Sequence, residues 1–115
     1  MKTPIIYTAL LFVGLAATIV SCNKTPTISA DICNGIGSKW STSVNALVQT
    51  KCATAHCHDG SVAGGTFTTR LGIKDNADNA LKAIYNKSMP QSSVSITETE
   101  RNQIMCWLQD GCPDN

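Results

Sequence analysis

Two cysteines and a histidine stand close together near the middle of the chain, as Cys52, Cys57 and His58. Thiols are nucleophiles and metal ligands, and imidazole binds transition metals through a ring nitrogen. A Cys-His pair with a second cysteine a few residues upstream is the pattern of covalent haem attachment. Each thiol adds across a vinyl group to form a thioether, and the histidine binds the iron. The usual pattern has two residues between the cysteines, whereas this chain has four, which weakens the match.

The same residues are open to other chemistry. Cys52 and Cys57 could form a disulfide, and together with His56 and His58 they have the ligand types of a zinc site. Three consecutive ligands cannot all point at one tetrahedral centre without severe bending, so zinc is the less favoured alternative. His56 precedes the second cysteine, and we expect it to face solvent in a bulge between two fixed attachment points.

Two helical segments are predicted to flank this cluster. Apolar residues at helical spacing predict a helix over residues 41–51, which runs into Cys52. A second apolar face predicts a helix over 75–87. It is expected to stop before Met89-Pro90, because proline biases the preceding residue away from helix.

A third helix has the clearest start in the chain. Thr97 and Glu100 have the spacing of a capping box, and Gly111 is expected to end the helix. Residues 66–73 are predicted to be a loop or a short extended piece. The predicted fold class is all-α, with three short helices joined by long loops.

Composition limits what the chain can do. Its 115 residues are enough for one domain. After residue 21 the basic and acidic side chains are equal in number, at 8 each, which excludes a general nucleic-acid binder with its basic face. Only 16 of those 94 residues are Leu, Ile, Val or Phe. Because so few residues make a thin core, we expect a metal, disulfides or a large apolar prosthetic group to support the fold.

The N-terminus has the pattern of an export and lipid-attachment signal. Lys2 is followed by an uncharged apolar run over 5–20, which is short for a membrane span. The run ends in Ile19-Val20-Ser21-Cys22, which resembles the bacterial lipobox. Residues 1–21 are therefore predicted to be a lipoprotein signal peptide, with cleavage before Cys22 and diacylation of that cysteine. An uncleaved anchor helix, or a plain secretory signal, is the alternative.

The predicted lipid places the mature protein outside the cytoplasm. Residues 22–40 are expected to form a lipidated tether and covering segment, and 41–115 the folded domain. We expect a periplasm-facing or surface lipoprotein of a Gram-negative bacterium, bound to a membrane through its acyl chains. Disulfides and covalent haem attachment are both possible in that compartment.

The layout of residues 41–115 resembles the small monohaem class I cytochromes c, particularly the lipoprotein-borne domains of bacterial outer membranes. A helix precedes the Cys-His cluster, Met89-Pro90 follows 31 residues after His58, and the last helix carries Trp107. The resemblance covers about two thirds of the chain. It implies that three helices and long loops wrap around one covalently bound haem c.

The resemblance also assigns roles to individual residues. Cys52 and Cys57 would form the thioethers, and His58 would be the proximal iron ligand. Met89 would be the distal ligand, presented by a loop that Pro90 fixes. Trp107 would pack on the first helix beside the haem.

Two methionines have competing roles. Met89 could instead be an ordinary core residue, because methionine fills gaps well. Met105 is the alternative iron ligand, although it lies inside the third predicted helix and is better suited to packing. The apolar residues expected to pack against the haem are Val44, Leu47, Val48, Leu71, Leu81, Ile84, Ile104 and Leu108.

Three cysteines remain after one is assigned to lipid and two to haem. On the last helix Cys106 lies about 200° around from Ile104, roughly opposite the inward stripe. A covering segment that carries Cys33 could reach that face, so Cys33–Cys106 is the preferred disulfide. Pairings that involve Cys112 stay open, because sequence cannot determine connectivity.

These assignments imply an electron carrier rather than an enzyme. Iron held by His58 and Met89 has no open position for oxygen or peroxide. The expected partners are redox proteins that dock transiently, and we expect a monomer without strong electrostatic steering. Two alternatives stay open: a haem-dependent enzyme subunit or gas sensor with a displaceable Met89, and a haem-free lipoprotein stapled by disulfides.

Overall fold

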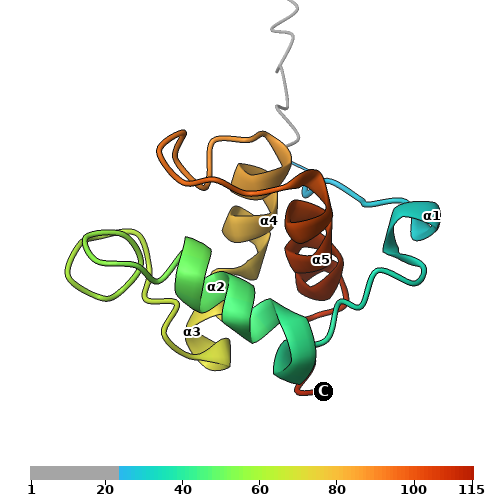
Figure 1. Ribbon diagram of the computed structural model, residues 1–115, viewed down its shortest axis with the longest axis horizontal. Coiled ribbons are helices and arrows are strands. Elements are labelled where there is room, and N and C mark those ends of the chain that lie inside the picture. The colour runs from blue at the N-terminus through green and yellow to red at the C-terminus, as the bar shows by residue number, and fades with distance from the viewer. Residues whose placement is uncertain (1–23) are drawn as a thin grey trace, which may run out of the picture.

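The computed structural model describes residues 24–115 (Figure 1). Its elements in chain order are α1 (Ala30–Cys33), η1 (Trp40–Val44), α2 (Asn45–Lys51), α3 (Arg70–Lys74), α4 (Ala77–Tyr85) and α5 (Glu98–Gln109). Within residues 24–115 there is helix and no strand, so the all-α prediction is confirmed. The predicted signal peptide and Cys22 lie outside the described residues.

Helix α5 is the centre of the structure and contacts α1, η1, α2 and α4. Its start follows the prediction, because Thr97 Oγ1 accepts a hydrogen bond from the Glu100 backbone N–H and Glu100 accepts one from the Thr97 N–H. These two bonds satisfy amides that the first helical turn leaves unpaired. Its second half is buried almost all round, through Ile104, Met105, Cys106, Trp107 and Leu108.

The first predicted helix is present as two joined pieces. The π-helical turn η1 continues directly into α2, which ends at Lys51. Trp40, at the start of η1, stacks on Trp107 with 5.0 Å between the ring centroids. Trp107 is fully buried and donates from its indole nitrogen to the Pro113 carbonyl. The last helix is therefore packed on the first through an aromatic pair, as expected of Trp107.

The prediction of only three helices is wrong, because α1 and α3 were not foreseen. Helix α3 lies partly in the segment expected to be loop or extended chain. It forms because Thr69 caps it, accepting a hydrogen bond from the Gly72 N–H. A Cβ on Gly72 would lie 2.1 Å from the Thr66 carbonyl oxygen, so this turn closes only around a glycine. Helix α1 is one short turn within the predicted tether.

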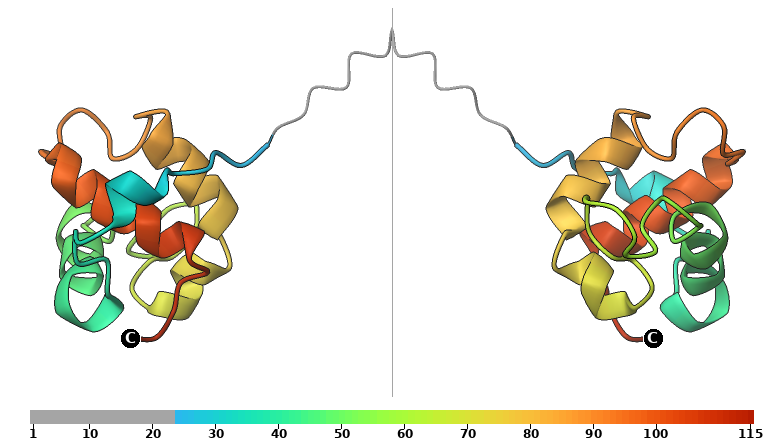
Figure 2. Two further views of the ribbon diagram at one scale, coloured as in Figure 1. Left: turned by 90° about the vertical axis from the view of Figure 1, so that its right-hand side faces the viewer. Right: turned by 90° about the vertical axis from the view of Figure 1, so that its left-hand side faces the viewer.

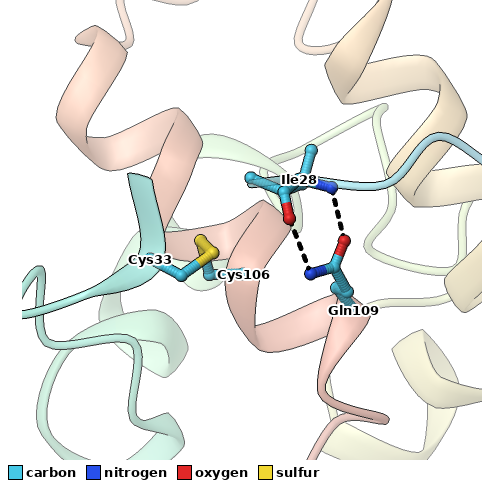
Figure 3. The surroundings of a disulfide bond; sticks show 4 residues. All are labelled: Ile28, Cys33, Cys106 and Gln109. Carbon is cyan, nitrogen blue, oxygen red and sulfur yellow. Dashed lines mark hydrogen bonds between the residues drawn. A yellow bond between two sulfur atoms is a disulfide. The ribbon is translucent and has the colours of Figure 1, made fainter. Parts of the chain in front are cut away.

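The N-terminal segment lies across α5 and is fastened to it (Figure 2). The disulfide Cys33–Cys106 joins α1 to α5, which confirms the preferred pairing. Figure 3 shows a second attachment beside it: Gln109 accepts from the Ile28 N–H and donates to the Ile28 carbonyl at 3.0 Å. This segment therefore covers one face of α5, as predicted. The remaining cysteine of the three, Cys112, is buried and free.

Candidate functional site

A cleft of about 670 Å³ lies between the end of α2, the loop that follows it, α4 and the loop after α4. Both loops project on the same side of the molecule (Figure 1). Cys52, Cys57, His58 and Met89 all line this cleft, although they come from segments separated by a whole helical hairpin. The volume is within the range of about 300–1,000 Å³ that is typical of ligand sites.

The segment 52–58 closes on itself at the end of α2. The Cys52 N–H caps the helix by donating to the Val48 carbonyl at 2.9 Å, and the His58 N–H donates to the Cys52 carbonyl at 3.0 Å. The second bond brings the His58 backbone back beside the first cysteine despite the five intervening residues. His56 is exposed, with a left-handed φ of 63°, and lies at the edge of the cleft. The predicted bulge is therefore present.

Cys52 and Cys57 are both free thiols, so the disulfide alternative does not describe this structure. Burial, and secondly the neighbouring Cys57, raise the pKa of the Cys52 thiol to about 11. Cys52 is therefore a protonated thiol at neutral pH. Within residues 24–115 no group of three or more His, Cys, Asp or Glu side chains is placed to hold a metal ion.

His58 is oriented from two sides. Its Nδ1 lies 3.0 Å from the Gly65 carbonyl oxygen, which can only accept, so Nδ1 carries the proton. The lone pair of Nε2 is then available to a metal, as in many metal sites where a carbonyl fixes the tautomer. The Phe67 ring stacks on the imidazole at 4.1 Å and 9°, and the Phe67 N–H donates to the His58 carbonyl at 2.8 Å.

Met89 is half-buried and lines the cleft just after the end of α4. Its N–H donates to the Ala83 carbonyl at 3.1 Å, so the turn after the helix determines where the residue lies. Its own carbonyl accepts from Arg101 at 3.0 Å. Met105 does not line the cleft; it is 5% exposed and packs within α5 as expected.

Sequence reasoning missed three supporting residues: Gly65, Phe67 and Arg101. The carbonyl of Gly65 has no side-chain signal that a sequence could reveal. Phe67 is the single phenylalanine after residue 21 and directly follows a Gly-Gly-Thr break, which was the available signal. Arg101 occupies an otherwise apolar face of the last helix, where a charged residue calls for a specific partner.

Eight apolar residues are expected to pack against a prosthetic group, and the structure places one of them at the cleft. Only Ile84 lines the cleft. Leu71 is exposed, and the other six pack in or against a core built around the Trp40–Trp107 pair and the N-terminal segment. Most of this core therefore lies away from the cleft, and Phe67, Ala80 and Ile84 belong to both.

No helix within residues 24–115 is long and apolar enough to cross a membrane. Comparisons of the chain with protein-family models, with curated proteins and with solved structures gave no match.

Proposed function

We propose that the protein is an extracytoplasmic electron carrier that holds one haem c in the cleft through Cys52, Cys57, His58 and Met89. The observation that carries the proposal is that all four residues, selected from their types and spacing, line a single cleft. Nothing in the local spacing of the chain requires Met89 to share a cavity with residues more than 30 positions upstream. A purely structural role for these residues gives no reason for this convergence.

The donor set fits a haem with two axial ligands. His58 has Nε2 free because Nδ1 donates to Gly65. Met89 supplies a thioether sulfur, which is a soft ligand that favours ferrous iron. The cleft also carries apolar contacts for a flat ring, including Phe67, Ala80 and Ile84.

The thiols of Cys52 and Cys57 have the attachment role. Each S–H adds across a vinyl C=C bond: the sulfur bonds to one carbon, the hydrogen goes to the other, and no oxidant is needed. When bound, the group supplies a one-electron iron couple whose potential is raised by methionine ligation. If His58 and Met89 both held the iron, no position would be left open to small molecules.

The arrangement of the helices supports the resemblance to class I cytochromes c. A helix leads into the Cys-His cluster, a methionine loop follows the next long helix, and α5 packs on the first helical segment. The chain differs in its four-residue cysteine spacing and in having α1 and α3 besides the three expected helices. Electrons would pass to and from redox proteins that dock transiently on this domain.

We further propose attachment to a membrane through lipid on Cys22. Ile28, which Gln109 fixes on α5, follows Cys22 by six residues. Six residues reach at most about 20 Å when fully extended. A lipid on Cys22 would therefore keep the domain beside the membrane, where its partners would also have to be.

Carbon monoxide binding tests the closed site against the gas-sensor alternative. The haem-loaded protein is reduced and mixed with carbon monoxide, beside a Met89→Ala variant whose distal position is open. We expect slow or incomplete binding to the wild type and rapid, complete binding to the variant. Equally rapid and complete binding to both proteins would contradict the electron-carrier proposal.

A further inference from the structure

Arg101 is a buried cation on α5, with 9% of its surface exposed. A buried charge is costly unless polar groups compensate it. The Arg101 Nη1 donates to two backbone carbonyls, that of Ile84 at 2.9 Å and that of Met89 at 3.0 Å. The nearest carboxylate, Glu98, is 4.0 Å from Nε and its side chain is largely exposed. The guanidinium therefore donates its short hydrogen bonds to main-chain oxygens, and its ion pair with Glu98 is long and largely exposed.

The two carbonyls lie at the two ends of one turn. Ile84 is in the last turn of α4, and Met89 lines the cleft. The chain between them reverses through Lys87, which has a left-handed φ of 60°, and the Met89 N–H returns to the Ala83 carbonyl. Arg101 thus joins this turn to α5 from the side, and α5 is the most deeply buried helix of the described chain.

We propose that Arg101 is a positioning residue that holds Met89 on the iron, an inference that rests on the proposed function. The Met89 backbone is held through its N–H by α4 and through its carbonyl by α5. With both groups held, the side chain leaves the backbone in one direction, toward the cleft that it lines. Without Arg101 the turn would keep only its attachment to α4, and the sulfur would compete less well with other ligands.

Arg70 offers a matched control. Its Nη1 donates to the Cys112 carbonyl at 2.8 Å, and its side chain is partly buried, so it also ties a turn to a helix. It does not line the cleft and has no hydrogen bond to the methionine loop. Arg70→Gln therefore removes a similar contact without affecting Met89.

The experiment is an imidazole titration of the oxidised, haem-loaded protein, because imidazole competes with methionine for the distal position. Wild type, Arg101→Gln, Arg101→Lys and Arg70→Gln are compared, and the sulfur-to-iron charge-transfer absorption is followed. We expect Arg101→Gln to bind imidazole about tenfold more tightly than wild type. Arg101→Lys, which keeps the charge and one donor, should give a smaller increase, and Arg70→Gln should match wild type.

Each outcome decides the proposal. Wild-type affinity in Arg101→Gln, or an equal increase in Arg70→Gln, would overturn the positioning role and leave the electron carrier intact. If Arg101→Gln does not fold, Arg101→Lys is the deciding variant. An imidazole affinity of Arg101→Lys equal to that of wild type would then overturn the positioning role. If wild type itself lacks the charge-transfer absorption, Met89 is not a ligand, and the proposed His/Met site fails first.

Discussion

A polar group and an aromatic ring together orient the His58 side chain. A main-chain carbonyl accepts from Nδ1, and the Phe67 ring covers one face of the imidazole. The hydrogen bond selects the tautomer, and the stacked ring restricts rotation about the side-chain bonds. Together they keep Nε2 available to a metal in the cleft.

Replacing Phe67 should therefore affect both stability and the site. Phe67 is 8% exposed, and truncating a buried phenylalanine to alanine costs about 3–5 kcal/mol. We expect Phe67→Ala to lower the free energy of unfolding by that amount in urea denaturation. Tyr85→Ala is the control, because Tyr85 is 52% exposed and should change stability by less than about 0.5 kcal/mol. Similar losses in the two variants would contradict the packing described for Phe67.

The candidate site residues could be found from the sequence, but the groups that orient them could not. Cys52, Cys57 and His58 are recognisable from type and spacing, and Met89 from its place before a proline in a polar stretch. The acceptor on His58 is the carbonyl of Gly65, a group that every residue has. Arg101 acts on carbonyls as well, so its role follows only from the fold.

Among the elements, α5 depends most on local sequence. Its capping box brings Thr97 and Glu100 together at the helix start, where Lys51 of α2 also lies 4.0 Å from Glu100. The hydrogen bond from the Thr97 N–H, and to a lesser degree the Lys51 charge, lower the pKa of Glu100 below its ordinary value of 4.5. The charged form of Glu100 is therefore favoured in the folded protein.

Acid should weaken this helix start. A lowered folded-state pKa gives stability that is present above the ordinary value of 4.5 and is lost as the pH falls through the folded value. We expect Glu100→Gln to be less stable than wild type at pH 7, with the difference shrinking below about pH 4.5. Thr97→Ala should cost about 1 kcal/mol at pH 7. Adding Glu100→Gln to Thr97→Ala should lower stability further at pH 7, because Thr97→Ala keeps the backbone N–H from which Glu100 accepts. No difference between Glu100→Gln and wild type in urea denaturation at pH 7 would refute this half of the cap.

The N-terminal segment depends on its disulfide rather than on its short helix. Cys33–Cys106 closes a sequence separation of 73 residues, and α1 has only four residues. We expect Cys33→Ser/Cys106→Ser to lower the free energy of unfolding by about 2–4 kcal/mol. A reductant should lower the denaturation midpoint of wild type and leave the double variant unchanged. If the reductant lowered the denaturation midpoint equally in both proteins, the loss of stability would come from another cysteine.

Helices α1 and α3 could not be predicted from sequence patterns. Helices 41–51, 75–87 and the last helix were predictable because apolar spacing and a capping box extend over several turns. Helix α3 has five residues, too few for a periodic pattern, and depends on a glycine that passes close to the Thr66 carbonyl. Such a contact joins the helix to the segment that precedes it and appears only once the chain is folded.

At the scale of the whole molecule, the core borders the cleft through Phe67, Ala80 and Ile84 and extends well beyond it. Trp40, Val44, Val48 and Trp107 lie in or against the core and do not line the cleft. Composition indicated that a metal, disulfides or a prosthetic group would support the fold, but it counts apolar residues without showing their packing and could not decide among these. The disulfide and the covering N-terminal segment supply part of what the composition lacked.

The haem-free chain should therefore remain folded. We expect Cys52→Ser/Cys57→Ser to retain helical circular dichroism and a near-ultraviolet signal from the Trp40–Trp107 pair, with one cooperative thermal transition below that of the loaded protein. Neither tryptophan lines the cleft, and the two rings stack on each other. Loss of the cooperative transition would show that the core needs the prosthetic group.

The intact mass of the purified protein tests the central claim most directly. Wild type and Cys52→Ser/Cys57→Ser are produced with their own N-terminus in bacteria that have haem-maturation machinery, so that any lipid or signal processing is common to both. We predict that wild type is red and heavier than the variant by one haem, after allowing for the two substitutions. A wild type that carries no such additional mass would contradict covalent attachment and, with it, the proposed electron carrier.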